Sequence, residues 1–287
     1  MNGDITQGRA DLHNHTTASD GLLTPMQLIG FAAQKGLKAA AITDHDTTEG
    51  IEEAIKAGQL YQVEIIPGIE LNTQIDSVEI HILGYFIDWH SMDLQSILHE
   101  MREIRRNRAK IMVERLSDLY GFDITYDEVL KEAKEGAVAR PHIGRVLMSK
   151  GIVKDIGEAF DKYIGTDCPA YVDRYHMTPK EGIELIEKAG GVPVLAHPGL
   201  LPSSDIADMV IECGIKGIEA FHNKHTEEQT KYYSLKAYQS DLIITGGSDC
   251  HGELYDGLPT IGDVSVDMEA VEKLRSLSWQ KKIKNNE

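Results

Sequence analysis

Short apolar runs alternate with amphipathic helical stretches along most of this 287-residue chain, and this alternation limits the folds open to it. The apolar runs have the length of strands and lie at residues 10–13, 37–43, 63–71, 78–86, 192–196, 217–221 and 242–245. Strands joined through helices pair mostly in parallel. The pattern therefore predicts an α/β fold, and its length suits a closed barrel.

The helices expected between these strands cover residues 24–35, 48–58, 204–213 and 226–239, and one more begins at residue 178. Two of them begin with a capping box and a proline in the first turn, at Thr24-Pro-Met-Gln27 and Thr178-Pro-Lys-Glu181. In this motif a threonine and the residue three positions later satisfy free backbone N–H groups. These signals place the helix starts directly.

One segment, residues 94–168, breaks the alternation because its pattern is helical throughout. We expect it to be a helical insertion domain, with residues 1–93 and 169–287 forming the barrel. Within it, the basic stretch at residues 102–110 is interleaved with Glu100 and Glu103, which favours a solvated helix face over an RNA-binding track. The polar residues 281–287 are expected to be frayed.

Composition narrows the classes of partner and compartment. The formal net charge of −17 argues against binding to long nucleic acid or to an anionic membrane. The three cysteines, Cys168, Cys213 and Cys250, are too scattered for a disulfide framework and fit a reducing cytoplasm. No signal peptide is visible at Met1, and no apolar run approaches membrane-spanning length. We therefore expect a cytoplasmic protein.

Nine candidate metal ligands gather in short clusters at or near the ends of the expected strands. They are His13, His15, Asp20, His45, Glu70, His81, His197, Asp249 and His251. Histidine and carboxylate suit borderline and hard divalent cations. The loops at the carboxyl ends of barrel strands meet at one face, so these distant clusters are expected to converge. Asp44 and Asp46, beside His45, are either turn residues or carboxylates that orient imidazoles.

In residue type, order and approximate spacing, these clusters resemble the PHP (polymerase and histidinol phosphatase) family of metal-dependent phosphoesterases. The resemblance runs from Asp11 to about His251 and fills every ligand position of the family. It implies a distorted seven-stranded (β/α) barrel that holds two or three divalent ions, usually manganese, iron or zinc. Ligand type alone does not separate these metals.

The resemblance also implies a role for each ligand. His13, His15, Glu70 and Asp249 would hold the first ion. Glu70 would bridge to a second ion, completed by His81 and His197, while Asp20, His45 and His251 would hold a third. Position 20 varies within the family, so Asp20 is the least constrained of the nine.

Further motifs resemble the family members that act on nucleotides. These are Ser19-Asp-Gly21, His81-Ile-Leu-Gly-Tyr85 and Ala139-Arg-Pro-His142 in the helical insertion. One departure is Phe221-His-Asn-Lys-His225, where the pattern aromatic-His-Pro-Ser-His is expected, and it leaves the substrate detail open.

The function implied is removal of the 3′-phosphate from nucleoside 3′,5′-bisphosphates by a metal-bridging hydroxide. Candidate anchors for the retained phosphate are Arg140, His142, His222 and Lys224, because a guanidinium grips phosphate through two hydrogen bonds. The partner expected is a small phosphorylated nucleotide or a short oligonucleotide. The group that protonates the leaving oxygen stays open.

Three other functions remain as alternatives. A 5′–3′ exoribonuclease on short RNA would use the same ions on a phosphodiester. A histidinol-phosphate phosphatase is disfavoured by the helical insertion. A metal-stabilised scaffold without catalysis is disfavoured because degenerate domains lose ligands and none is missing here.

Overall fold

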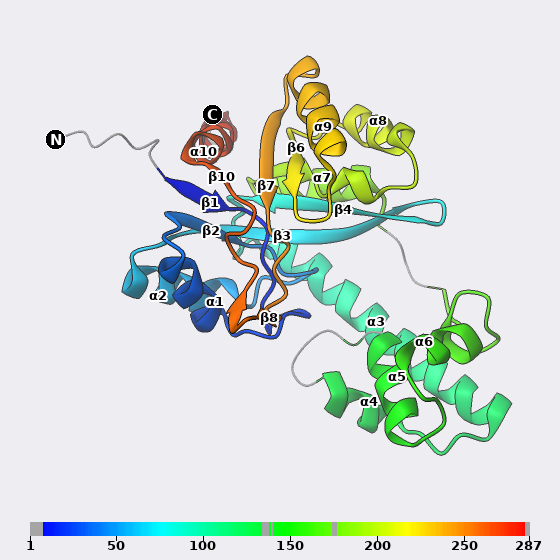
Figure 1. Ribbon diagram of the computed structural model, residues 1–287. Coiled ribbons are helices and arrows are strands. Elements are labelled where there is room, and N and C mark those ends of the chain that lie inside the picture. Colours follow the sequence, from blue (N-terminus) through cyan, green and yellow to red (C-terminus); the bar gives the residue numbers. More distant parts are fainter. Residues whose placement is uncertain (1–7, 134–137, 139, 174–176, 285–287) are drawn as a thin grey trace. The chain divides into compact units, whose positions relative to one another are not determined.

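A computed structural model describes residues 8–133, 138, 140–173 and 177–284 of the chain. The chain divides into two compact units, one formed by Met1–Gln95 with His176–Glu287 and the other by Ser96–Tyr175 (Figure 1). The first unit is called the barrel unit and the second the helical unit. The sequence analysis expected an insertion domain bounded by residues 94 and 168, and those boundaries stay a prediction.

The barrel unit is built on one eight-stranded sheet with the order β10-β1-β2-β3-β4-β5-β6-β7. Its strands are β1 (Arg9–Asp11), β2 (Ala39–Ile42), β3 (Glu64–Ile75), β4 (Val78–Tyr85), β5 (Val192–Leu195), β6 (Gly217–His222), β7 (Ile243–Gly247) and β10 (Val266–Asp267). Pairing is parallel except that β4 runs against both neighbours and β10 runs against β1. The predicted barrel is confirmed, with one strand more than the seven expected.

Contacts beyond the regular ladders bring the two ends of the sheet together. The backbone N–H of Leu12 donates to the carbonyl of Gly246 at 3.2 Å, and Asn14 forms a parallel bridge with Cys250. These contacts join the residues that follow β1 to those of β7 and beyond. The sheet is therefore nearly closed into a barrel, and the segments after β1 and β7 lie side by side.

Helices surround this sheet (Figure 1). They are α1 (Pro25–Gln34), α2 (Ile51–Tyr61), α7 (Pro179–Lys188), α8 (Ser204–Glu212), α9 (Glu227–Gln239) and α10 (Met268–Lys284), with a 3-10 turn η2 at Pro198–Leu200. Both predicted capping boxes, at Thr24 and Thr178, are present, and Thr226 forms a third at the start of α9. A short hairpin, β8 (Leu254–Tyr255) with β9 (Leu258–Pro259), follows β7.

The last helix corrects the prediction of a frayed terminus. Residues 281–284 belong to α10, and residues 285–287 lie outside the described part. Val271 and Leu274 of α10 join the barrel core, and Ser278 Oγ donates to the carbonyl of Gly190 just before β5 at 2.9 Å. The helix therefore covers the amino ends of the strands and leaves their carboxyl ends to the loops.

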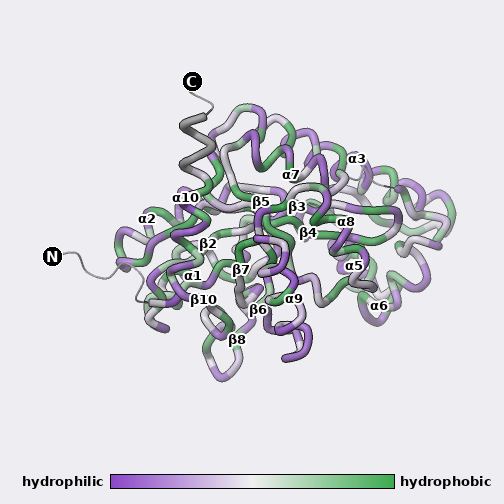
Figure 2. The backbone as a smooth tube through the Cα atoms, turned by 90° about the horizontal axis from the view of Figure 1, so that it is seen from above, coloured by the Kyte–Doolittle hydropathy of each residue, from purple (hydrophilic) through white to green (hydrophobic). Residues whose placement is uncertain are grey.

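Hydropathy along the chain follows this architecture (Figure 2). The barrel core consists of small side chains such as Ala10 and Ala39 with larger ones such as Ile66, Leu83 and Tyr85. The strands are mainly apolar, whereas α2 alternates apolar and polar residues as a helix with one buried face does. Burial of the apolar positions thus accounts for the alternation in the sequence.

The helical unit has its own core. Its elements are α3 (Met92–Tyr120, which begins in the barrel unit), α4 (Tyr126–Ala133), α5 (Arg140–Ser149), α6 (Ile156–Ala159) and a π-helical turn η1 (Phe160–Ile164). Met112, Leu116, Val129 and Leu147 are buried in its centre. The described residues of this unit contain no strand, as the pattern predicted. Among the described residues of the whole chain, no helix is both long and apolar enough to cross a membrane.

Candidate metal centre

All nine candidate ligands belong to the barrel unit, and most of them follow its parallel strands. His13 and His15 follow β1 and are fully buried, which their i, i+2 spacing in extended backbone allows. Asp249 and His251 follow β7 with the same spacing. Glu70, 1% exposed, lies within β3 and not at its end, and the same holds for His81 in the antiparallel strand β4.

Glu70 occupies the centre of the cluster, and its two oxygens face different histidines. Oε2 lies 3.1 Å from His13 Nε2, 3.2 Å from His15 Nε2 and 3.2 Å from His45 Nδ1. Oε1 lies 2.9 Å from His81 Nδ1. His197 Nε2 is 3.1 Å from the same oxygen. A carboxylate arranged in this way has the geometry of a bridge between two cations.

Three atoms on the Oε2 side lie close together. His13 Nε2 and His15 Nε2 are 3.1 Å apart, and Glu70 Oε2 is 3.1 Å from the first and 3.2 Å from the second. Asp249 Oδ1 lies 3.4 Å from His13 Nε2 and 3.2 Å from His15 Nε2. These four residues offer the nitrogen and oxygen ligands that a divalent cation accepts.

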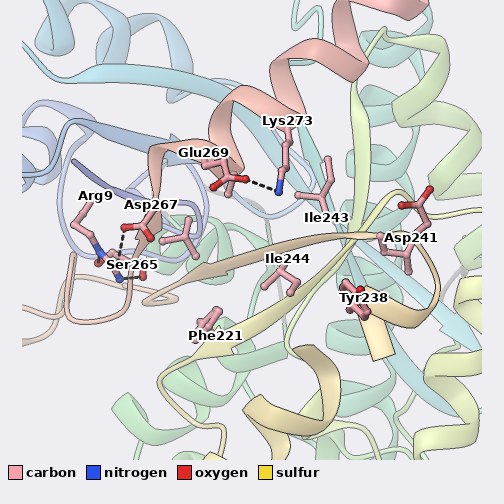
Figure 3. A pocket seen from close by; sticks show the side chains of 13 residues that line it. Arg9, Phe221, Tyr238, Asp241, Ile243, Ile244, Ser265, Asp267, Glu269 and Lys273 are labelled. Carbon is pink, nitrogen blue, oxygen red and sulfur yellow. Dashed lines mark hydrogen bonds and ion pairs between the residues drawn. The ribbon is translucent and has the colours of Figure 1, made fainter. Parts of the chain in front are cut away.

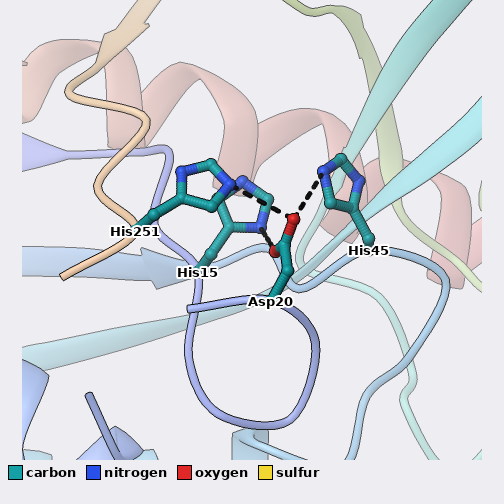
Figure 4. A group of neighbouring side chains, drawn as sticks. All are labelled: His15, Asp20, His45 and His251. Carbon is teal, nitrogen blue, oxygen red and sulfur yellow. Dashed lines mark ion pairs between the residues drawn. The ribbon is translucent and has the colours of Figure 1, made fainter. Parts of the chain in front are cut away.

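A second group lies beside the first and opens toward solvent (Figure 4). Asp20 Oδ2 is 3.5 Å from His251 Nε2 and 3.9 Å from His45 Nε2, while Asp20 Oδ1 is 3.7 Å from His15 Nδ1. The Asp20 side chain is 55% exposed, more than its three histidine neighbours. His45 thus faces Glu70 with one ring nitrogen and Asp20 with the other, which the sequence did not indicate.

Several buried atoms of the cluster have no hydrogen-bond partner within the described residues. They are Glu70 Oε2, His15 Nδ1 and His45 Nδ1. A buried polar atom without a partner costs about 1–3 kcal/mol. A bound cation would satisfy Glu70 Oε2, so the residues present fit a metal centre.

The electrostatics of the cluster point the same way. Burial alone would raise the pKa of Glu70, yet His13, His45 and His81 hold it well below its ordinary value. Burial likewise opposes the charged form of His81, but the neighbouring Glu70 raises the pKa of His81 to about 10. Burial lowers the pKa of His45 to about 4. The cluster therefore stabilises positive charge next to Glu70, which protons or metal ions can supply.

Asp44 holds the loop that carries Asp20. Its carboxylate accepts from the Thr16 backbone N–H at 2.7 Å, from Thr16 Oγ1 at 2.8 Å and from Ser19 Oγ at 2.6 Å. Of the two roles left open for this residue, the hydrogen bonds favour that of a turn residue. Asp46, the other residue beside His45, accepts from the backbone N–H of Asn72 at 2.9 Å.

Asp11 ties the closing segments of the barrel together behind the site. Its buried carboxylate accepts from the backbone N–H groups of His13 at 3.2 Å and Gly262 at 2.7 Å. It also accepts from the backbone of Ser248 at 3.0 Å and from Ser248 Oγ at 2.6 Å. This residue fixes the His13 backbone relative to the Asp249 segment.

Glu219 is the buried acid of the site that the sequence analysis missed. It is 0% exposed, lies in β6 and has Oε1 3.0 Å from His13 Nδ1. The register of β6 shifts between Glu219 and Phe221, and this irregularity lets Glu219 and His222 both face the barrel interior. A lone acid within the apolar run 217–221 is the signal that would have identified it.

The proposed phosphate anchors separate into two groups. His222 and Lys224 reach the metal cluster, with His222 Nε2 at 3.4 Å and Lys224 Nζ at 3.7 Å from Asp249 Oδ2. Arg140 and His142 belong to α5 of the helical unit, where the Arg140 guanidinium lies 5.1 Å from the centre of the Phe160 ring. That Arg140 and His142 bind a phosphate of the substrate stays a prediction. Ala139 of the same motif lies outside the described residues.

A separate hollow of the barrel unit lies between β7, β10 and α10 (Figure 3). Four of its five charged lining residues form pairs, since Arg9 pairs with Asp267 at 2.9 Å and Lys273 pairs with Glu269 at 2.8 Å. None of the nine candidate ligands lines this hollow. The chemistry therefore belongs to the histidine cluster.

Comparison with known proteins agrees with this geometry. Residues 11–164 match the PHP domain. The chain is 37% identical over 251 residues to the 5′-3′ exoribonuclease Rnm of Escherichia coli (strain K12), covering 84% of each protein. It is 32% identical over 250 residues to the 3′,5′-nucleoside bisphosphate phosphatase of Chromobacterium violaceum, covering 84% of this chain and 86% of the relative. A crystal structure named for a metal-dependent phosphoesterase of Bifidobacterium adolescentis superposes with a TM-score of 0.78 at 33% identity, covering 93% of this chain and 96% of that one.

Proposed function

This chain belongs to the PHP domain family of metal-dependent phosphoesterases, and we propose on that premise that it removes the 3′-phosphate from nucleoside 3′,5′-bisphosphates. Hydrolysis of a phosphoester follows from the family and its named relatives. The substrate is the proposal. It is supported by a relative named for this reaction, which matches over most of both chains.

The observation that carries the catalytic proposal is the division of the two Glu70 oxygens. One oxygen lies within 3.2 Å of His13, His15 and His45, and the other lies within 3.1 Å of His81 and His197. We infer that His13, His15, Glu70 and Asp249 would hold one divalent ion, and that Glu70, His81 and His197 would hold a second. Asp20, His45 and His251 are the proposed place of a third ion.

Divalent ions held by these residues would supply Lewis acidity toward the phosphate oxygens and would make water a nucleophile near neutral pH. The protein's part is to hold the ligand atoms in this arrangement and to place the substrate. His222 and Lys224 are suited to the second task, because they lie beside Asp249 at the rim of the cluster. The Lys224 side chain is 62% exposed, so its ammonium can meet an incoming phosphate.

A 5′–3′ exoribonuclease is the second candidate. The relative from Escherichia coli carries that name and matches over 84% of this chain. Both activities need the same ions, and they differ in whether a phosphomonoester or a phosphodiester occupies the site. The departure at residues 221–225 contains Lys224 and therefore bears on this choice.

The deciding experiment measures metal-dependent phosphate or nucleotide release from four substrates. They are adenosine 3′,5′-bisphosphate, 5′-AMP, histidinol phosphate and a 5′-phosphorylated RNA oligomer. His13→Ala is expected to abolish activity, whereas the matched control His90→Ala, at an exposed histidine outside the cluster, is expected to retain it. Preference for the oligomer would make the chain an exoribonuclease. Silence on all four with manganese supplied would refute the proposed function.

Lys224 can be tested as the anchor of the retained phosphate. Lys224→Met is expected to raise the KM for the bisphosphate about tenfold, which corresponds to about 1.4 kcal/mol of binding free energy. The KM for 5′-AMP is expected to stay nearly unchanged, because 5′-AMP has no second phosphate. Lys231→Met in α9 is the matched control, since Lys231 is 79% exposed and pairs only loosely with Glu227 at 3.9 Å. Equal KM changes for both substrates would remove Lys224 from the proposed role.

We also propose a cytoplasmic location. The three cysteines are free thiols in this structure, which supports a reducing compartment.

Manganese, iron and zinc all suit the nitrogen and oxygen ligands of the site. Metal analysis of the purified protein would identify the ion and count the sites.

A further inference from the structure

Glu219 contacts ligands from two different parts of the proposed centre. Its Oε1 lies 3.0 Å and its Oε2 lies 3.2 Å from His13 Nδ1. Its Oε2 accepts the backbone N–H of His197 at 2.8 Å. His13 is assigned above to one ion and His197 to the other, so one carboxylate supports both.

The contact with His13 determines which ring nitrogen can bind a cation. An ionised carboxylate only accepts hydrogen bonds, so the nitrogen that faces Glu219 must carry the proton. The proton on Nδ1 leaves a lone pair on Nε2, which is the atom that lies 3.1 Å from Glu70 Oε2.

The contact with His197 holds an unusual backbone conformation. His197 has a φ of 26°, in the left-handed region that side chains with a Cβ rarely adopt, and Pro198 follows it. Such a conformation costs on the order of 1–3 kcal/mol and persists only where the surroundings enforce it. The hydrogen bond from its N–H to Glu219 is one such restraint, and it aims the imidazole at Glu70 Oε1, 3.1 Å away.

We propose that Glu219 is a positioning residue of the metal centre, which fixes the His13 tautomer and the His197 backbone so that both imidazoles present a lone pair to the cations. The proposal rests on the metal centre of the proposed function but does not depend on the substrate. It makes β6 a contributor to metal affinity although β6 supplies none of the nine proposed ligands.

Glu219→Gln tests this directly because it keeps the size of the side chain. The amide offers one acceptor oxygen in place of two, and the donors of His13 and His197 then compete for it. The amide NH₂ then either faces the N–H of His13 or His197, which is unfavourable, or it donates to His13 Nδ1. In the second case the His13 proton moves to Nε2, where it blocks the cation. Carboxylates that orient metal-binding histidines contribute about 10–100-fold to metal affinity.

The experiment titrates the metal-stripped full chain with Mn²⁺ and measures free Mn²⁺ by electron paramagnetic resonance, giving the number and affinity of the sites. The matched control is Ser278→Ala, which removes another buried hydrogen bond, to Gly190 at 2.9 Å, in a part of the barrel that contacts no proposed ligand. Thermal unfolding of each metal-free variant reports the structural effect separately. Glu219→Gln is expected to weaken the tightest Mn²⁺ site by about 10–100-fold, and Ser278→Ala is expected to retain wild-type affinity while losing stability.

Wild-type Mn²⁺ affinity in a folded Glu219→Gln protein would overturn the proposal. Equal weakening by Ser278→Ala would also overturn it, because the effect would then be structural. If Glu219→Gln fails to fold, Glu219→Asp decides. That variant keeps the charge but sets the carboxylate back by one methylene, so it is expected to weaken Mn²⁺ binding, and wild-type affinity would refute the proposal.

The test separates the two hypotheses of the preceding sections. A wild-type chain that binds Mn²⁺ tightly but hydrolyses none of the four substrates would sink the proposed substrate and leave the role of Glu219 standing. A wild-type chain that binds no Mn²⁺ would overturn both.

Discussion

Glu70 shows how one side chain can organise a site contributed by several strands. Its two oxygens face five imidazoles in all, from His13, His15, His45, His81 and His197. The sequence presents Glu70 only as an acid near a strand end, after Pro67 and Gly68. The barrel makes it central, because β3 lies between β2 and β4 in the sheet.

Replacement of Glu70 is the sharpest prediction at the scale of one residue. Glu70→Gln is expected to lower metal-dependent activity by at least about 100-fold, because an amide offers one oxygen where two cations need one each. The control Glu212→Gln changes an exposed acid at the end of α8 and is expected to retain activity. Steady-state rates at saturating manganese would check both, and a Glu70→Gln enzyme within tenfold of wild type would contradict the bridging role.

The histidines also predict how the metal-free protein responds to alkaline pH. Against the effect of burial, the neighbouring carboxylates of Asp249 and Glu70 raise the pKa of His15 to about 9, and Glu70 raises that of His81 to about 10. Both values exceed the unfolded value of about 6.5. The resulting stability is therefore fully present below about pH 6.5 and is lost as the pH rises through 9 and 10.

We therefore expect the free energy of unfolding of the metal-free chain to fall by more than about 1.4 kcal/mol between about pH 7 and 10. Bound ions replace the protons on these nitrogens, so the manganese-loaded chain should lose less over the same range. Urea unfolding at several pH values checks this. Identical curves with and without manganese would count against it.

At the scale of elements, the loops after the strands decide where the ligands lie. The loop after β1 carries Asp20, and its shape depends on hydrogen bonds from Thr16 and Ser19 to Asp44, which follows β2. Two loops from neighbouring strands thus stabilise each other. Asp20 is the most exposed of the proposed ligands, at 55%, and is not held by packing. Its position therefore depends on the hydrogen bonds between these two loops.

Asp44→Asn is expected to release this loop and to lower the metal content by one ion per chain. An amide can replace only one of the two accepting oxygens, so at least one bond to Thr16 or Ser19 is lost. Asp76→Asn in the exposed β3–β4 turn is the control, since asparagine tolerates its positive φ of 52°. Metal analysis of both proteins decides, and full metal content in Asp44→Asn would contradict the coupling of the loops.

At the scale of the whole molecule, we expect the two compact units to divide their tasks. All nine proposed ligands lie in Met1–Gln95 or His176–Glu287, and each unit has its own apolar core. Arg140 and His142, proposed to bind phosphate, lie in Ser96–Tyr175. This division suggests that metal binding belongs to the barrel unit, and that the helical unit adds selectivity.

Replacing residues 96–175 by a short glycine-serine linker tests this division. The shortened chain is expected to fold, to bind the same number of manganese ions and to hydrolyse an activated ester such as p-nitrophenyl phosphate. Its kcat/KM for the bisphosphate should fall by at least tenfold, about 1.4 kcal/mol. Unchanged selectivity would refute the proposed anchors, whereas failure to fold would show that the barrel unit does not fold on its own.

The sequence by itself determined the α/β barrel, because strand and helix periodicities are local and the seven longer strands each carry a clear apolar run. It missed β10, which has two residues, and it missed α10. It also identified the candidate ligands, since clusters of histidine and acidic residues are visible in the sequence without a fold.

Only the tertiary structure decided that Glu219 belongs to the site, that His45 faces both Glu70 and Asp20, and that Asp44 and Asp46 bind backbone. Those relations join residues far apart in the chain, and strand pairing and closure of the sheet, not local sequence, bring them close together.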